Sequence, residues 1–544
     1  MAHCVPLGLL APRGSLLTDC WEAAPRFTAL VPHHFRDPLA FVRHAEALDR
    51  HSVDRGGLQT VLGEQNRAFS AAPAALRQLE RFADPRAVAV VGGQQAGLFS
   101  GPLYTIHKAV TILHLAAELE GRLGRPVIPV FWIASEDSDL AEIDHVFVTD
   151  TTGSLQEISL AKPAGEPGRL PVSQVRFGAE IGPAIEALKA SLAETAFSPA
   201  ILDTLHAAYA PGRSYPQAFG RFMSSLFSGQ GLVLVDPSDT RLKAMAHELF
   251  RREIEERSPV SAAVREQSRR MLAAGYQPQI ELREDMLTLF HQDPAREAIA
   301  VQGDGFLFKD SGRSLGAAEL LRILEAEPGS FSPNALLRPL YQDTIFPTIA
   351  AVLGPAELAY FTQLTSAYRR LAIPMPILFP RASVTLLEAK LARTMARLGI
   401  GIEDVLARGA SLFEDVVKKE IPADLSSSLA AGRAQVQEIW KGLAARIARL
   451  DPTLGPTAAL ATAAGLKQFA FMEKKITQAA KKRHGTLRGQ LERITSSLFP
   501  RSGLQERTLT AAPLLARYGM RVLEEENRMV DIFEPVHHCV EIGP

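Results

Sequence analysis

The chain has 544 residues, and its 59 Lys and Arg nearly cancel its 60 Asp and Glu, leaving a formal net charge of −1. This balance gives no electrostatic argument for a nucleic acid or an anionic membrane as a partner, and it leaves a small charged metabolite open. The length exceeds one ordinary core and 47% of the residues are hydrophobic, so we expect two or three packed globular units.

No stretch approaches the roughly 18 to 20 consecutive apolar residues of a membrane helix. The N-terminal MAHCVPLGLLAPRGSLL has neither a basic leading region nor a long apolar centre, so we expect no signal peptide and a cytoplasmic protein. Cys4, Cys20 and Cys539 form no CxxC pair, which argues against a disulfide framework or a cysteine-based zinc site. The adjacent His537, His538 and Cys539 are more typical of a polar tail than of a metal site, so we predict no metal-ligand set.

The N-terminal part of the chain carries the pattern of a βαβ unit. The valine-rich run 87–92 is typical of a strand buried on both faces, and a second apolar run covers 126–134. Between them, apolar residues recur at steps of three and four over 104–119, which predicts an amphipathic helix. Two strands joined through a helix are expected to be parallel.

Later segments extend this core. The runs 231–236 and 377–379 predict further buried strands, and a long helix is expected at 240–257. Alternating patterns around 158–177 and 298–309 predict small antiparallel additions. The predicted fold class is therefore α/β, a parallel sheet interrupted by insertions.

The C-terminal part changes character. Apolar residues over 425–450 step by four and three, which is typical of a coiled-coil seam, with Gly432 as a single interruption. The segment 487–498 repeats the spacing, and the turn-forming LDPTLGPT at 450–457 separates the two, so we expect an antiparallel helical hairpin. A basic stretch at 474–483 is interpreted as a solvated face.

The loop GGQQAGLFSGPLYTIHK, which follows the first predicted strand, carries the first candidate site. Its glycines fit neither the GxxxxGK[ST] pattern of a P-loop nor the GxGxxG pattern of dinucleotide folds. What remains is a glycine-rich turn at a strand end, where backbone approaches a ligand and a helix N-terminus favours an anion. The histidine and the lysine of this loop could equally be ordinary helix-face residues. The candidate binding residues here are Gly93, Gln94, Gln95, Gly97, Tyr104, His107 and Lys108.

A second polar loop, SEDSDLAEIDH, follows the second predicted strand. Its carboxylates could orient an amine, bind a magnesium ion or act as a general base, or they could merely suit a helix N-terminus. Because both loops follow parallel strands, we expect them to open into one crevice. The candidates in this loop are Glu136, Asp137, Asp139, Glu142, Asp144 and His145.

Two later segments supply further polar candidates. An arginine just past a strand end suits a substrate carboxylate through a bidentate contact, or forms an ion pair between domains. The candidates are Arg338, Gln342, Asp343, Glu357, Tyr360 and Arg381.

Four motifs, in order along nearly the whole chain, carry a resemblance to a known family. They are GGQQAGLFSGPLYTIHKA, PVFWIASEDSDLAEIDHV, LLRPLYQDTIFPT with GPAELAYFTQL, and LQER. By these motifs the chain resembles the bacillithiol biosynthesis cysteine-adding enzyme family, BshC. The resemblance implies a Rossmann-like core, similar to nucleotidyltransferases and class I synthetases, over 1–384 with connecting segments inserted at about 150–230 and 260–335. It also implies an α-helical coiled-coil dimerisation domain over 385–505 and a tail over 506–544 that packs back on the core.

The same resemblance implies the last step of bacillithiol synthesis, in which the carboxyl group of cysteine is joined to the amino group of glucosaminyl-malate. A carboxylate and an amine do not condense unaided in water, so we expect activation by ATP, with Mg²⁺ as a candidate ion. His107 and Lys108 would then stabilise charge on the transferring phosphate. The residues assigned to catalysis are His107, Lys108, Glu136, Asp137 and Asp139.

One departure from the family pattern is visible. The family usually has EDHD where this chain has EDSD, so Ser138 replaces a histidine, which is either dispensable or covered by His107 and His145. Two alternatives to the ligase remain open: a metabolite-binding or scaffold protein without catalysis, and an ATP-dependent ligase for another amino acid.

Overall fold

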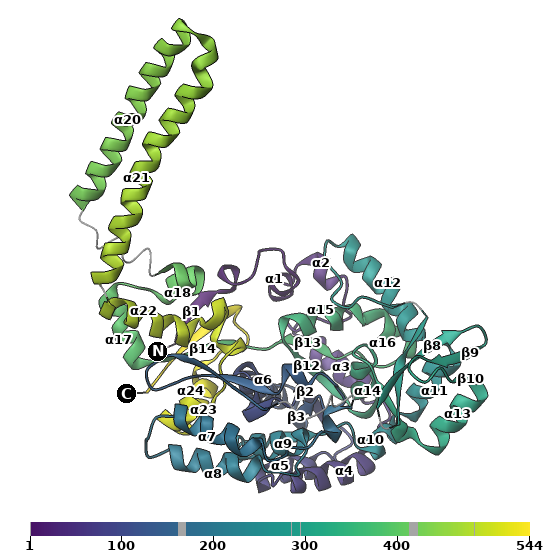
Figure 1. Ribbon diagram of the computed structural model, residues 1–544. Coiled ribbons are helices and arrows are strands. Elements are labelled where there is room, and N and C mark those ends of the chain that lie inside the picture. Colours follow the sequence, from purple (N-terminus) through teal and green to yellow (C-terminus); the bar gives the residue numbers. More distant parts are fainter. Residues whose placement is uncertain are drawn as a thin grey trace. The chain divides into compact units, whose positions relative to one another are not determined.

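The computed structural model describes residues 2–161, 170–283, 285–293, 295–412, 423–483 and 485–543. The chain divides into two compact units (Figure 1). The core unit comprises Met1–Ala389 and Gly503–Pro544, and the helical unit comprises Lys390–Ser502.

Five parallel strands form the central sheet of the core unit. They are β2 (Val88–Gln94), β3 (Val127–Ile133), β6 (Val233–Val235), β12 (Thr348–Leu353) and β13 (Ile377–Pro380). Their order is β13-β12-β2-β3-β6, and every residue of β3, β6, β12 and β13 is buried. The predicted parallel α/β core is confirmed.

The strand order of this sheet reverses at β2. β3 and β6 follow on one side of it, and β12 and β13 lie on the other. Glycine is required in β2 because its neighbours come close: a Cβ on Gly92 would lie 2.9 Å from the Val352 carbonyl oxygen, and one on Gly93 would lie 2.5 Å from that of Trp132. In open parallel sheets, ligands bind at the carboxyl ends of the strands beside such a reversal.

The crossover between β2 and β3 is α6 (Tyr104–Leu123), which packs on both strands. It ends at Gly124, whose left-handed φ of 59° favours glycine. The helix predicted over 104–119 is therefore present and runs one turn further.

The other helices of the core unit pack around its sheets (Figure 1). They are α1 (Leu16–Trp21), α2 (Pro25–Thr28), α3 (Ala40–Leu48), α4 (Arg55–Ala68), α5 (Pro73–Arg81), α7 (Ile181–Ser191), α8 (Ser198–Ala208), α9 (Tyr215–Leu226), α10 (Thr240–Met245), α11 (His247–Glu255), α12 (Pro259–Ala273), α13 (Ala317–Ala326), α14 (Leu337–Ile345), α15 (Pro355–Gln363), α16 (Thr365–Leu371), α23 (Ala512–Tyr518) and α24 (Arg521–Met529). The single helix predicted at 240–257 is two helices, α10 and α11, because the backbone leaves helical geometry at Ala246 (φ −99°, ψ 12°).

A second sheet is inserted between β6 and β12. Its order is β10-β9-β8-β7-β11, with antiparallel neighbours throughout. Its strands are β7 (Met286–Gln292), β8 (Arg296–Gln302), β9 (Gly305–Phe308), β10 (Ser314–Gly316) and β11 (Phe331–Pro333). The antiparallel addition predicted around 298–309 is confirmed as the β8–β9 hairpin.

The other predicted addition lies earlier than expected. β4 (His145–Thr149) and β5 (Leu155–Ser159) form the antiparallel pair, so only the start of the predicted segment 158–177 is strand. Residues 172–174 form a 3₁₀ turn instead, and 162–169 lie outside the described residues.

A third sheet joins distant parts of the chain in the order β1-β15-β14. It consists of β1 (Ala2–Pro6), β14 (Ser383–Glu388) and β15 (Val536–Ile542). His537 forms hydrogen bonds with the hydroxyl groups of Ser383 and Thr385, both at 2.8 Å. This buried histidine therefore holds strands together.

The helical unit contains a long hairpin. α20 (Ala423–Leu450) and α21 (Gly455–Arg483) run antiparallel, joined by a 3₁₀ turn at Pro452–Leu454 (Figure 1). The predicted coiled-coil hairpin is confirmed, with one correction to its second helix. The apolar repeat at 487–498 lies on α22 (Gly485–Leu498), which packs against α18 (Ile402–Arg408) rather than pairing with α20.

Glycines on the hairpin make room for aromatic rings. A Cβ on Gly432 would lie 3.1 Å from the Phe469 ring, and one on Gly465 would lie 3.2 Å from the indole nitrogen of Trp440. The apparent interruption at Gly432 is thus a packing position. Among the described residues, α17 (Ala389–Leu398) is a further helix. Within the basic stretch 474–483, Lys474 and Lys475 are exposed, and the side chains from 477 onward lie outside the described residues.

Among the helices of the described chain, none is both long and apolar enough to traverse a bilayer.

Candidate active site

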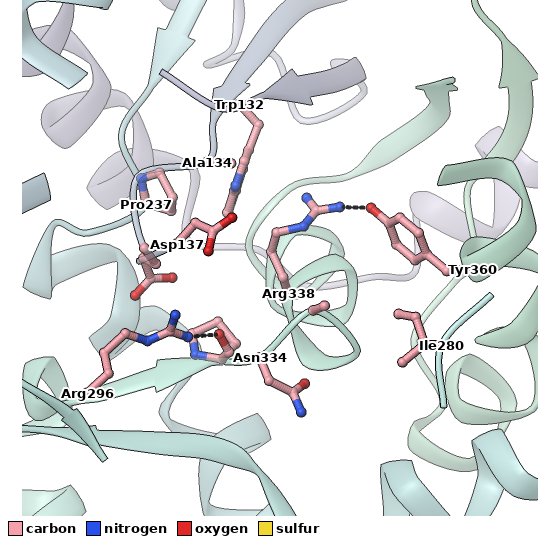
Figure 2. A pocket seen from close by; sticks show the side chains of 12 residues that line it. Trp132, Ala134, Asp137, Pro237, Ile280, Arg296, Asn334, Arg338 and Tyr360 are labelled. Carbon is pink, nitrogen blue, oxygen red and sulfur yellow. Dashed lines mark hydrogen bonds between the residues drawn. The ribbon is translucent and has the colours of Figure 1, made fainter. Parts of the chain in front are cut away.

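Two neighbouring pockets, the small lobe and the large lobe, lie beside the carboxyl ends of β3 and β6. The small lobe has a volume of about 220 Å³ and the large lobe about 440 Å³. They share the lining residues Asp137, Ile280, Arg296, Asn334 and Ala335, so the two lobes adjoin each other. Figure 2 shows the small lobe, whose polar lining consists of Trp132, Glu136, Asp137, Arg296, Asn334, Arg338 and Tyr360.

The acidic loop after β3 is held in place by its own hydrogen bonds. The Asp137 carboxylate accepts hydrogen bonds from the side-chain amide of Gln95 and from the backbone N–H of Ser138, both at 2.7 Å. The Asp137 carbonyl accepts one from the backbone N–H of Val172 at 2.7 Å. The loop therefore presents Glu136 and Asp137 to the small lobe as a fixed acidic wall.

Glu136 is almost fully buried, with 7% of its surface exposed. Its nearest cation is Lys243 on α10, whose Nζ lies 2.9 Å from Glu136 Oε1. Burial raises the pKa of Glu136, and the positive charge of Lys243 opposes that rise. A buried carboxylate with a raised pKa is suited to accept a proton.

Two arginines, Arg296 and Arg338, form a basic wall of the same lobe. Arg338 donates to the hydroxyl of Tyr360 at 2.5 Å, and Arg296 donates to the Ser332 hydroxyl and the Pro333 carbonyl at 3.1 and 3.0 Å. Figure 2 shows both guanidinium groups lining the small lobe. In the part of the chain that the structure describes, neither has a carboxylate within 4.0 Å. Their positive charge is available to an anionic ligand.

Lys108 occupies the reversal point of the central sheet. Its side chain is 1% exposed, and its amino group donates to the Gly93 carbonyl at 2.5 Å, to Gln94 at 3.0 Å and to Glu357 at 2.5 Å. Burial lowers the pKa of Lys108, and the neighbouring Glu357 opposes this. Glu357 also accepts from the backbone N–H of Gly354 at 2.7 Å, at the start of α15. A carboxylate thus lies between a buried lysine and a helix N-terminus.

His107, predicted to be catalytic, is not brought to the cavity. It is fully buried, and its Nδ1 lies 2.7 Å from a carboxylate oxygen of Glu526 on α24. Consecutive residues of a helix point about 100° apart, so Lys108 faces the sheet reversal while His107 faces the C-terminal segment. The expectation of a single crevice that includes His107 therefore does not match the geometry.

Arg381 forms a bidentate ion pair with Glu506 at 3.0 and 2.7 Å, within the core unit. Burial alone would raise the pKa of Glu506, but the ion pair lowers it to about 2. Arg381 also lies over the ring of Tyr104, 5.8 Å from its centroid. Arg381 was expected either to bind a substrate carboxylate or to form an ion pair between domains. It forms an ion pair, but its partner Glu506 lies in the same unit.

The remaining candidates occupy structural positions. Asp139 accepts from the Ala141 N–H at 3.1 Å and caps a 3₁₀ turn, and His145 pairs with Asp144 at 3.0 Å. Gln342 donates to Asp343 at 2.9 Å inside the core. A Cβ on Gly97 would lie 2.8 Å from the Gly101 Cα, so Gly97 permits a tight turn.

Four lining or supporting residues were not predicted from the sequence: Trp132, Lys243, Arg296 and Asn334. Trp132 lies in a fully buried strand, Lys243 in the short helix α10, Arg296 two residues before the antiparallel addition predicted around 298–309, and Asn334 directly after β11. No local pattern distinguishes them, since only the tertiary fold brings them to β3. Within the described ranges, no group of three or more His, Cys, Asp or Glu side chains is arranged to hold a metal ion.

These features define a Rossmann-like α/β protein with a charged cavity at the carboxyl ends of its parallel strands, joined in one chain to a helical coiled-coil unit. Family comparison agrees with both parts. The model described as the bacillithiol biosynthesis BshC N-terminal Rossmann-like domain matches residues 6–382, and that of the BshC C-terminal coiled-coil domain matches residues 384–542. The chain belongs to the BshC family.

Relatives cover nearly the full chain. A protein of Koribacter versatilis is 35% identical over 523 residues, which is 96% of each chain. A protein of Salinibacter ruber is 32% identical over 545 residues, 99% of this chain and 98% of its own. One of Chlorobaculum tepidum is 32% identical over 97% of this chain and 94% of its own. All three carry the name "Putative cysteine ligase BshC".

Proposed function

We propose that the chain is a cysteine ligase that catalyses the last step of bacillithiol synthesis. In this reaction the carboxyl group of cysteine forms an amide with the amino group of glucosaminyl-malate. The observation that carries the proposal is the pairing of an acidic wall, Glu136 and Asp137, with a basic wall, Arg296 and Arg338, around one small cavity. Glucosaminyl-malate has one ammonium group, which suits the acidic wall, and two carboxylates, which suit the basic wall.

The charges of the cavity suit the chemistry of amide formation. Arg296 and Arg338 would bind the malate carboxylates through charge-assisted hydrogen bonds. An ammonium group must lose a proton before its nitrogen can attack, and Glu136, whose pKa is raised, is the base nearest to the bound amine in this arrangement.

ATP, when bound, supplies the leaving group that makes the cysteine carboxyl reactive. Lys108 and the N-terminus of α15 already hold the Glu357 carboxylate between them, so a phosphate would bind there only in place of that carboxylate. A Mg²⁺ that arrives with ATP is usually held by phosphates and water rather than by a protein cage.

We further propose a cytoplasmic homodimer. The reaction consumes ATP and a free thiol, which stays reduced in the cytosol. The hairpin leaves apolar side chains exposed in the single chain, among them Ile439 at 59%, Leu460 at 72% and Phe471 at 52%. A second hairpin related by a two-fold axis would cover such a surface on both chains.

The test is product formation by the purified full chain with glucosaminyl-malate, ATP and a panel of amino acids. Of the amino acids in the panel, we expect only cysteine to give a product, which is bacillithiol. The variants Arg338→Met and Glu136→Gln should form no product. Tight binding of glucosaminyl-malate without any product would favour the metabolite-binding protein. Product with serine or alanine, and none with cysteine, would favour a ligase for another amino acid.

A further inference from the structure

We propose that Lys243 is a positioning residue for the reaction: it holds the Glu136 carboxylate charged and directed into the small lobe, where Glu136 takes a proton from the substrate ammonium. This inference rests on the proposed function. It adds a residue that lies outside the lining of either lobe.

The geometry fixes Lys243 at two points. Its side chain is 3% exposed, and its Nζ lies 2.9 Å from Glu136 Oε1 and 3.2 Å from the carbonyl oxygen of Gly329, to which it donates. These two contacts fix the position of the Lys243 amino group. Its position in turn limits where the Glu136 side chain can lie.

Glu136 lines the small lobe, and its two carboxylate oxygens have different surroundings. Oε1 is buried and lies against the Lys243 ammonium, which is outside the lining of the lobe. Oε2 is not among the buried atoms without a partner, and no described residue donates a hydrogen bond to it. A substrate ammonium in the small lobe can donate to this second oxygen while Lys243 holds the first.

Among the charged groups around Glu136, Lys243 acts most strongly on its carboxylate. Of the described cations, it alone lies within 4.0 Å of the carboxylate. Burial raises the pKa of Asp236, and hydrogen bonds from Ser135 and Ser238 to its carboxylate oppose that rise. The titratable and charged groups that face Glu136 from the packed elements are Lys243 on α10, Arg296 on β8, Arg338 and Tyr341 on α14, Asp236 after β6, and Asp137 on its own loop.

The proton and electron balance needs no further group. Glu136 takes one proton from the ammonium, and the lone pair of the resulting amine attacks the activated carboxyl carbon of cysteine. The bond to the activating group breaks, and that group leaves with its electron pair. The new amide nitrogen then releases a second proton to solvent. Lys243 takes part in no bond change, which makes it a positioning residue rather than a catalytic one.

The test measures binding of glucosaminyl-malate by calorimetry over about pH 5.5 to 8.5 for the wild type, Lys243→Met and Lys243→Arg. Loss of the lysine charge raises the pKa of Glu136, so Lys243→Met should lose affinity about tenfold near pH 7 and bind with release of an extra proton at that pH. Lys243→Arg, which retains the charge, should restore most of the affinity. An unchanged pH profile in Lys243→Met, with lowered stability only, would overturn the proposal.

A second measurement separates this inference from the proposed function. If the wild type binds no glucosaminyl-malate, the proposed function fails. The interaction of Lys243 with Glu136 is then measured without ligand, through the pH dependence of the free energy of unfolding. Lys243→Met should lose stability relative to the wild type as the pH rises from about 5 to 8, because an unpaired buried carboxylate must ionise. The double variant Lys243→Met, Glu136→Gln should fold and lack this pH dependence. Equal, pH-independent losses in both variants would refute the role of Lys243.

Discussion

Lys108 and Glu357 form an ion pair of 2.5 Å across the point at which the strand order of the central sheet reverses. Lys108 comes from the helix that follows β2, and Glu357 from the helix that follows β12. The pair therefore ties the two halves of the sheet together at the place where ligands of such folds bind.

Lys108→Met should destabilise the core unit by about 3 kcal/mol, the lower end for breaking a buried ion pair, because Glu357 is a quarter exposed and partly solvated. ATP-dependent product should be lost in the same variant. Urea unfolding measures the stability. Lys189→Met, which removes a lysine that is 56% exposed, serves as the matched control and should change stability by less than about 0.5 kcal/mol. Equal effects in the two variants would contradict the buried pair.

His107→Ala should destabilise the protein by about 2 to 3 kcal/mol, because it leaves the buried Glu526 carboxylate without its partner. Binding of glucosaminyl-malate by the folded fraction should be unchanged, since His107 does not line the cavity. Thermal unfolding and calorimetry check the two parts. A fully stable His107→Ala variant that forms no product would restore the catalytic role that the sequence suggested.

Glu506→Gln tests the electrostatics of the ion pair with Arg381. The folded-state pKa of Glu506 is lowered to about 2, so its charge stabilises the fold above the unfolded pKa of about 4.3, and this stabilisation is lost as the pH falls toward 2. The variant should be less stable than the wild type by about 3 kcal/mol at pH 7. Urea unfolding at several pH values should show this difference shrinking below about pH 4. A difference that does not change with pH would mean that packing, not charge, explains the loss.

Replacing Ile439 and Leu443 together by Glu should give monomers in light scattering while the core unit stays folded. Ile439 is 59% exposed and Leu443 40% exposed in the single chain, and they lie four residues apart on one helix face, so the change places charge on the proposed dimer surface. Lys441→Glu, at a position 77% exposed on the same helix, is the control and should remain dimeric. Dimers of unchanged affinity in the double variant would show that the partner surface lies elsewhere.

The sequence predicted the architecture because the apolar periods of strands and helices are local. The valine-rich β2 and β3, the amphipathic α6 and the hairpin turn at 450–457 could all be read from spacing. The error at 487–498 is of another kind: α22 has the same apolar spacing as α20, and spacing does not say which helix packs on which. Tertiary contacts decided that α21 is the partner.

The candidate site was predictable only in part. Glu136 and Asp137 follow the end of β3, Arg338 stands at the start of α14 and Tyr360 lies within α15. All four were predicted as polar residues in an apolar context, and all four line the small lobe. His107 and Arg381 stand in equally suggestive places, but buried carboxylates 419 and 125 residues away engage them. Lys243 and Arg296 reach the site from other elements of the fold. Partners so distant in sequence leave no local signal.

The proposed reaction joins an activated cysteine carboxyl to the amine of glucosaminyl-malate in this cavity. It is tested with cysteine labelled with ¹⁸O in the carboxyl group, ATP and glucosaminyl-malate, and with mass spectrometry of the thiol product and of the spent nucleotide and phosphate. We expect bacillithiol, with one labelled oxygen transferred to the AMP or phosphate released, and loss of both signals in Glu136→Gln. Bacillithiol without any transfer of label, or no bacillithiol at all from the folded wild type, would refute the proposed reaction.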